Sequence, residues 1–226
     1  MKTAKLVAVA LAMIPAAALA VTYSPDANAC GMSIRMDPTP QKPTPVQEIA
    51  RAEKALENGQ NLVAVKAVLG NFPKVRVATA GTNPLETRAL RVFALAVVRS
   101  NGAVNEKTAG FSSQGDWTPT ANLEWAVQAI REIDAKRPND PTVQADLGEA
   151  LSKLPHGQGE AMKILQGLAQ KDLMGSPQAY AALAKLRTDQ GDSAGAQAAI
   201  KRCEEMSKSP GVCKPAAAKP AVAAKA

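Results

Sequence analysis

The sequence of 226 residues predicts an all-α fold built from about four stacked helical hairpins. One series of residues, separated by 7, 5 and 4 positions, occurs near both ends of the chain: Ala52, Gly59, Ala64, Val68 and Ala184, Gly191, Ala196, Ile200. Alanines that would lie at helix crossings recur at intervals of 35 residues: Ala126, Ala161 and Ala196. A hairpin that recurs in one chain indicates a stack in which neighbours bury each other's apolar faces.

Five helix starts are marked by a capping residue followed by proline. They are Thr44-Pro45, Asn83-Pro84, Thr118-Pro119, Asp140-Pro141 and Ser176-Pro177. Proline suits the first helical position because that N–H has no partner within the helix. The preceding side-chain oxygen can accept a hydrogen bond from the first turn. Gln47 and Glu86 stand where a capping box requires them.

The first hairpin is expected over residues 44–58 and 61–70, with Gly59 in the turn, because Ile49, Ala52 and Leu56 recur at helical spacing. A connector follows, and it contains Val75-Arg76-Val77. This alternation resembles a strand, but no second strand candidate exists to pair with it.

The remaining hairpins follow from the same apolar periodicity. They are expected over residues 84–100 with 119–136, 141–154 with 159–171, and 177–190 with 193–207. Between the helices of the second hairpin lies an insertion, residues 102–118, rich in Gly, Ser and polar residues. Loops of this length are uncommon in compact domains and are often functional.

The ends of the chain differ from this helical region, residues 44–207. Residues 1–29 have the basic start, apolar run and small-residue cleavage signals of a secretory signal peptide. Residues 30–43 form a proline-bearing linker, and residues 208–226 form a Lys/Ala/Pro tail that we expect to be disordered. The sequence therefore predicts an exported protein of the periplasm or cell envelope.

The cysteines are consistent with export. Cys203 and Cys213 frame a segment that can turn back, so an oxidising compartment would join them; a free, buried Cys203 is the alternative. Cys30 follows a cleavage signal and resembles the lipid-modified cysteine of bacterial lipoproteins, although Ala27 stands where that signal usually has Leu. Membrane attachment is expected only if Cys30 is lipidated or the signal peptide is retained.

The residues that usually carry catalysis are missing. His156 is the only histidine, and it lies in a predicted turn without a catalytic partner motif. No metal-ligand spacing or phosphate-binding loop is present, so we expect no enzyme activity, no catalytic residues, no metal and no cofactor. The formal net charge is +7. In an exported chain this charge suits acidic protein partners or anionic envelope surfaces, and we expect no nucleic-acid partner. The alternative is that the charge serves solubility alone.

Over residues 44–207 the chain resembles the tetratricopeptide-repeat (TPR) family. The fourth hairpin resembles it most, and the third has the family's Leu-Gly pair as Leu147-Gly148. Residues 138–141 resemble the linker that joins two repeats. The family's aromatic positions are mostly Leu, Val or Ala here. A different pairwise helical repeat or a helical bundle is the alternative.

The resemblance implies an α-solenoid whose first helices line a concave groove that binds a protein partner. In that geometry Arg99, Lys153 and Lys185 would face the groove and hold an acidic segment. The alternative is that they are ordinary surface cations, and Glu149 and Asp189 at neighbouring positions would partly cancel their charge. The expected function is an exported protein–protein interaction scaffold of the bacterial cell envelope. The alternative is a structural envelope protein that binds an anionic surface polymer through its basic tail.

The insertion offers a second candidate binding region. Phe111 and Trp117 are two of its residues, and an aromatic side chain beside a loop can anchor a partner. The alternative is that Trp117 packs back onto the helix that follows it.

The export hypothesis predicts that the mature chain begins after residue 20 or residue 29. Sequencing the N-terminus of the natural protein distinguishes these two starts. A lipid on an N-terminal Cys30 would identify a lipoprotein, whereas an intact Met1 in the cytosol would contradict export.

Overall fold

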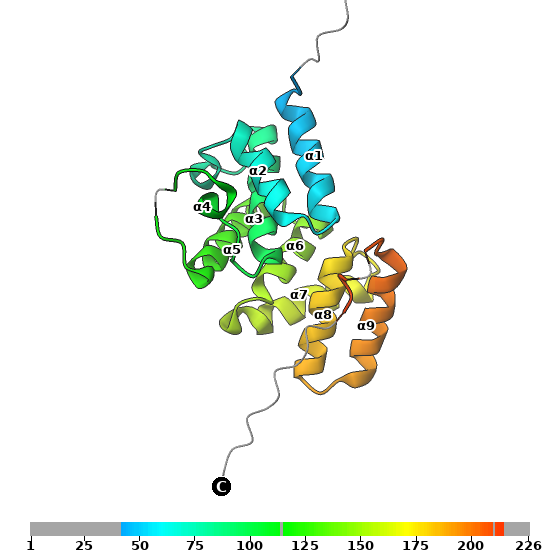
Figure 1. The fold of residues 1–226 in the computed structure, drawn as a ribbon. Coiled ribbons are helices and arrows are strands. Elements are labelled where there is room, and N and C mark those ends of the chain that lie inside the picture. The colour runs from blue at the N-terminus through cyan, green and yellow to red at the C-terminus, as the bar shows by residue number, and fades with distance from the viewer. Residues whose placement is uncertain (1–41, 114, 210, 215–226) are drawn as a thin grey trace, which may run out of the picture. The chain divides into compact units, whose positions relative to one another are not determined.

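The computed structural model describes residues 42–113, 115–209 and 211–214. Every regular element in these ranges is helical, which confirms the all-α class (Figure 1). No helix among them is long and apolar enough to cross a membrane. The predicted signal peptide, Cys30, most of the linker and the end of the tail lie outside the described residues.

The helices agree with the predicted hairpins to within a few residues. The long helices are α1 (Pro45–Glu57), α2 (Asn61–Asn71), α3 (Pro84–Arg99), α5 (Pro119–Lys136), α6 (Pro141–Leu151), α7 (Gln158–Gln170), α8 (Pro177–Asp189) and α9 (Ser193–Met206). Short helical turns interrupt the connections: η1 (Val75–Val77), α4 (Glu106–Ala109) and η2 (Pro155–Gly157). The strand-like residues 75–77 thus form a 3₁₀ turn.

All five predicted caps are formed. Thr44 and Gln47 make a reciprocal capping box at the start of α1. The Asn83 side chain accepts from the N–H groups of Leu85 and Glu86, which is half of such a box. The other three caps likewise accept from the first turn of their helix: Thr118, Asp140 and Ser176.

The helices pack in chain order. Each predicted hairpin is formed by contacts of α1 with α2, α3 with α5, α6 with α7, and α8 with α9. The second helix of each hairpin then packs on the first helix of the next, as α2 on α3, α5 on α6, and α7 on α8. The first helices also touch in succession, α1 with α3, α3 with α6, and α6 with α8.

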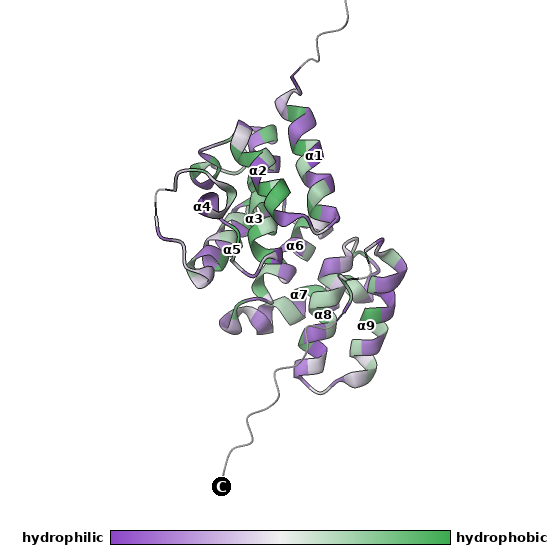
Figure 2. Ribbon diagram, viewed as in Figure 1, coloured by the Kyte–Doolittle hydropathy of each residue, from purple (hydrophilic) through white to green (hydrophobic). Residues whose placement is uncertain are grey.

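Small residues occupy the crossings, as the repeated spacing predicts. The alanines of the pattern are all buried: Ala52, Ala64, Ala126, Ala161, Ala184 and Ala196. A Cβ added to Gly148 would lie 2.6 Å from the Leu165 Cδ2, so α6 and α7 approach too closely for a side chain there. The apolar faces meet inside the stack, while polar residues cover the outer helix surfaces (Figure 2).

The two ends of the insertion lie next to each other. Gly102 has φ +78°, and a Cβ there would lie 2.1 Å from the carbonyl oxygen of Pro119. The Asn122 side-chain amide donates to the carbonyls of Gly102 (2.9 Å) and Val104 (2.8 Å). The start of the insertion is therefore held against the first turns of α5.

This close approach predicts that Gly102→Ala destabilises the protein. A left-handed backbone and a clash with backbone atoms together should lower the free energy of unfolding by about 2–4 kcal/mol. Urea denaturation measures the change.

Gly167→Ala is the matched control, because Gly167 lies inside α7 with open space around it. There alanine should raise the free energy of unfolding by about 0.5–1 kcal/mol, since it favours the helix over glycine. Equal urea midpoints for the two variants would contradict the role assigned to Gly102.

Candidate functional site

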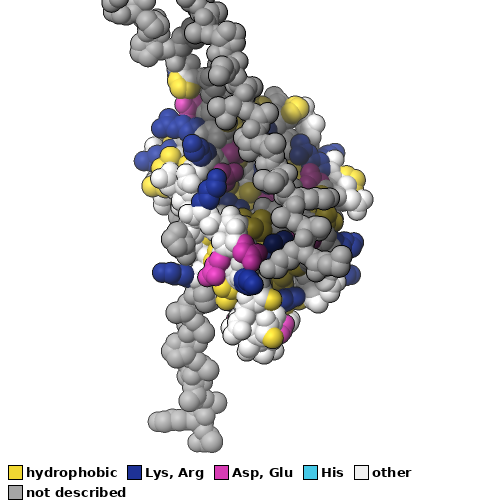
Figure 3. Space-filling view, turned by 90° about the vertical axis from the view of Figure 1, so that its right-hand side faces the viewer, with side chains coloured by type: hydrophobic (Ala, Val, Ile, Leu, Met, Phe, Trp, Pro, Cys, Tyr) yellow, Lys and Arg dark blue, Asp and Glu magenta, His cyan; other side chains and the backbone are white. Residues whose placement is uncertain are grey.

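The first helices α1, α3 and α6 are joined by ion pairs. Arg88 of α3 contacts Glu53 of α1 (2.6 Å), and Arg91 of α3 contacts Asp146 of α6 (2.5 Å). Figure 3 shows basic and acidic side chains side by side on one face of the molecule. Asp146 is buried, and a buried charge is costly unless it is paired, so its contact with Arg91 constrains how α3 and α6 sit against one another; the Arg88–Glu53 pair is more exposed.

Arg99 makes the most buried of these pairs. Its Nε and Nη2 donate to the two carboxylate oxygens of Glu149 at 3.0 and 3.1 Å. The side chains of Arg99 and Glu149 are 12% and 3% exposed. The pKa of Arg99 is raised: burial, the largest influence, opposes the charge, but the Glu149 carboxylate outweighs it together with weaker attraction from Asp146 and Glu57. Arg99 therefore links α3 to α6 through its two hydrogen bonds to Glu149.

Two cavities adjoin along these helices and form what we call the groove. They share the lining residues Leu56, Asn58, Arg99 and Gln178. The first cavity, the ion-pair pocket, has a volume of about 570 Å³ and includes Glu53, Arg91 and Asp146. The second, the lysine pocket, has a volume of about 420 Å³ and includes Lys153, Lys185 and Lys214.

The two pockets differ in charge. In the ion-pair pocket, three acidic residues, Glu53, Glu57 and Asp146, are matched by three basic ones, Arg91, Arg99 and Lys208. In the lysine pocket, Arg99 and the three lysines face Glu149 as the one acidic residue among the described lining residues. The excess positive charge of the groove therefore lies in the lysine pocket.

Lys153 is the most distinctive cation of this pocket. It follows Ser152, the C-cap residue of α6, and is partly buried. Burial lowers the pKa of its ammonium group; Glu149 opposes this, and Lys185 and Arg99 add to it. Within the described residues no carboxylate lies within 4.0 Å of the Lys153 Nζ, whereas Lys185 contacts Asp189 at 2.5 Å. An anion beside Lys153 would favour its charged form.

The structure thus brings the three predicted groove residues, Arg99, Lys153 and Lys185, into one pocket. It changes the role of Arg99, whose donors are directed at Glu149. Sequence reasoning missed Lys214, which it assigned to the tail. The signal that could have found it is the predicted Cys203–Cys213 bridge, which turns the chain back next to Lys214.

That bridge is consistent with the structure. The two sulfur atoms lie at bonding distance, 2.08 Å, and both cysteines are buried. Val212 also packs against the core. The predicted boundary at residue 208 is therefore too early, because the bridge and Val212 hold the chain against the helices up to Lys214.

The insertion is held by Arg76 of η1. Its guanidinium pairs with the buried Glu106, and its Nη2 donates to the Glu106 Oε2 (3.0 Å) and the Asn122 Oδ1 (2.8 Å). The same guanidinium lies over two indole rings, with its carbon 4.0 Å from the ring centroid of Trp117 and 4.3 Å from that of Trp125. Such contacts are favourable for a cation removed from water.

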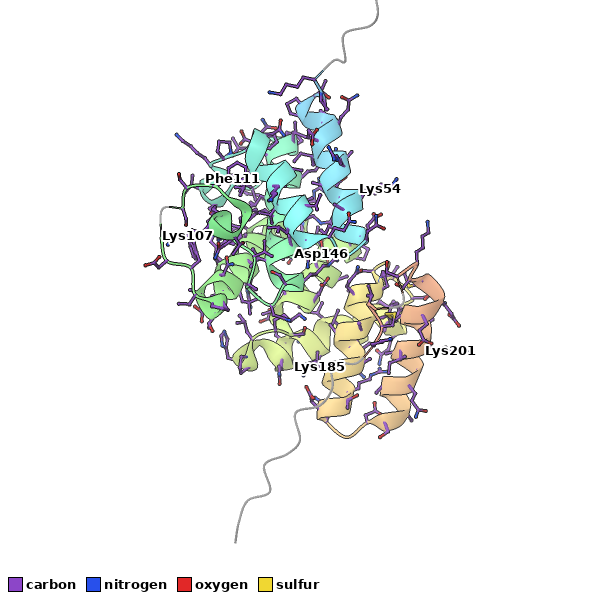
Figure 4. The ribbon with its side chains drawn as sticks, viewed as in Figure 1. Lys54, Lys107, Phe111, Asp146, Lys185 and Lys201 are labelled. Atoms are coloured by element: carbon purple, nitrogen blue, oxygen red, sulfur yellow. A yellow bond between two sulfur atoms is a disulfide. The ribbon has the colours of Figure 1, made fainter. Side chains whose placement is uncertain are left out.

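This geometry does not support Phe111 and Trp117 as partner anchors. Trp117 packs on Arg76 and on Trp125 of α5, in line with the alternative that it folds back onto the following helix. Phe111 is partly buried and packs against the core (Figure 4). Both rings are already used within the chain.

Evidence for other chemistry is absent from the described part of the chain. His156 is exposed in η2. No group of three or more His, Cys, Asp or Glu side chains in the described ranges is arranged to hold a metal ion. Comparison of the chain with protein-family models, curated proteins and solved structures finds no match.

The Arg76 contacts predict a large effect of Arg76→Met. Removing the guanidinium leaves Glu106 buried without its partner, which should lower the free energy of unfolding by about 3–5 kcal/mol. Urea denaturation of Lys107→Met is the control, because the Lys107–Asp116 pair is exposed to solvent and should contribute little to stability. Similar losses for both variants would contradict the importance of Arg76.

Lys153 yields a prediction about pH. Because its pKa in the folded protein lies below the ordinary 10.5, charging it opposes folding at neutral pH. Lys153→Met should therefore melt at the same or a higher temperature than the natural chain at pH 7. As the pH rises through the lowered pKa towards 10.5, the natural chain loses this penalty, so the difference should shrink. Lys163→Met, on the exposed surface of α7, is the control.

Proposed function

We propose that this chain is an exported TPR-like scaffold that binds an acidic segment of a protein partner in its groove. The observation that carries the proposal is the uneven charge of the groove: a charge-balanced pocket adjoins one with an excess of cations. Lys153 adds a partly buried ammonium group without a carboxylate partner among the described residues.

An extended peptide suits this arrangement better than a small anion. The ion-pair pocket has apolar as well as charged lining, including Leu95, Pro177 and Met206. Carboxylates in the lysine pocket could accept charge-assisted hydrogen bonds from Lys153 and Lys185, while apolar side chains of the same segment lie against Leu95 and Met206. Apolar contact and a few placed charges together give a peptide both affinity and direction.

The order of helix contacts supports a repeat array of the TPR type. Each second helix touches the next first helix, and the first helices touch in series to line one groove. The signal-like start and the paired cysteines support a place in the periplasm or cell envelope, because disulfides persist in oxidising compartments.

The test uses two fluorescent peptides. The acidic probe carries two leucines near its start and three glutamates at its end, and the neutral probe has glutamines in place of the glutamates. Fluorescence anisotropy should show that the acidic probe binds the protein and that the neutral probe does not. Raising the salt concentration should weaken it, because mobile ions screen charges at a wet surface.

The lysine pocket predicts which variants lose binding. Lys153→Met and Lys185→Met should each lower the affinity for the acidic probe by about tenfold, which corresponds to the loss of one charge-assisted hydrogen bond. Lys163→Met should bind like the natural chain. Equal affinities for Lys153→Met and Lys163→Met, or no binding by the natural chain, would overturn the proposal.

A further inference from the structure

We infer that the Cys203–Cys213 disulfide completes the binding groove, so that the groove binds its acidic partner only in the oxidised chain. This inference rests on the proposed function and adds the condition under which the site exists. It concerns the segment after α9, residues 207–209 and 211–214, which we call the C-terminal wall.

The C-terminal wall lines both pockets. Ser207 and Lys208 line the ion-pair pocket next to Met206, the last residue of α9. Cys213 and Lys214 line the lysine pocket, together with Ser209, Gly211 and Val212. One short segment therefore borders the groove along both of its halves.

Few interactions besides the disulfide hold this wall. The Ser207 hydroxyl donates to the Ser209 carbonyl (2.8 Å), and the Val212 N–H donates to the same carbonyl (3.1 Å). Within the described residues, the hydrogen bonds of positions 208–214 stay inside residues 207–214. Val212 and Cys213 supply the apolar burial.

The disulfide supplies the constraint that keeps the C-terminal wall ordered. Ordering the backbone costs conformational entropy at every residue, and two small apolar side chains bury too little surface to offset that cost over a segment of this length. The bond to Cys203, which is buried in α9, fixes Cys213 with a Cα–Cα distance of 5.7 Å. Without it, the wall and Lys214 would leave the pocket.

The oxidation needs an oxidant that itself carries a disulfide, either a protein or a small molecule. The Cys203 thiolate attacks one sulfur of that disulfide and releases one oxidant thiol. The Cys213 thiolate then attacks the sulfur of Cys203 in the mixed disulfide and releases the second oxidant thiol. Two electrons and two protons pass to the oxidant, and the Cys203–Cys213 bond remains. A chain that has not met an oxidising compartment would thus lack a complete groove.

The first experiment compares redox states with the acidic probe. The natural chain should bind in its oxidised form and bind about tenfold more weakly after reduction with excess dithiol, and reoxidation should restore the affinity. Cys203→Ser with Cys213→Ser should behave like the reduced chain. Circular dichroism shows whether that double variant keeps its helices.

The second experiment leaves the disulfide intact. Lys214→Met should weaken binding in the oxidised chain but have no further effect in the reduced one, because Lys214 then no longer lines the pocket. Lys201→Met is the control, since Lys201 extends from α9 into solvent (Figure 4). An equal effect of Lys214→Met in both redox states would overturn the inference.

The two proposals can fail separately. If Lys153→Met weakens binding but the helical double cysteine variant binds like the oxidised chain, the groove function stands and the disulfide requirement is wrong. If Lys153→Met binds the probe as the natural chain does, the proposed function itself fails.

Discussion

The structure depends on helices that cross at very small residues. Ala52, Ala126 and Ala161 are fully buried at such crossings, and at Gly148 no Cβ fits against Leu165. Only 3% of the residues are aromatic, so aliphatic side chains fill most of the space between these close contacts. Since closely packed interiors leave little free space, each of these contacts limits the distance between two neighbouring helices.

Close approach has an electrostatic consequence. It brings charges on α3 and α6 together in surroundings with little water, where Arg91 meets Asp146 and Arg99 meets Glu149. Burial raises the pKa of Asp146 even though Arg91 lies beside it. Removing either partner of such a pair would leave a buried charge without compensation, so each pair restricts how α3 and α6 can pack. In the lysine pocket Arg99 and Lys185 are paired in this way, with Glu149 and Asp189, whereas Lys153 has no carboxylate within 4.0 Å among the described residues.

The groove draws on all four hairpins. Its lining comes from the end of α1, from α3, α6, α8 and α9, and from the residues after α9. Segments far apart in the sequence therefore have to be in place together before the charge distribution of the groove exists. The groove that we propose as a binding site is therefore a property of the packed helices together with the residues that follow α9.

The sequence by itself determined the eight long helices, the five proline-marked caps and the pairing of helices into hairpins, because these depend mainly on apolar periodicity and on neighbours a few residues away. It also indicated the Cys203–Cys213 bridge, with a free Cys203 as the alternative. Only the tertiary structure decided that Arg99 pairs with Glu149, 50 residues away. It also decided that the Trp117 ring packs against Arg76 of the same chain and not against a protein partner. It also decided that Lys214 belongs to the groove. A periodic pattern specifies which face of a helix is buried, but the partner of a charge or an aromatic ring depends on distances between helices that no local pattern contains.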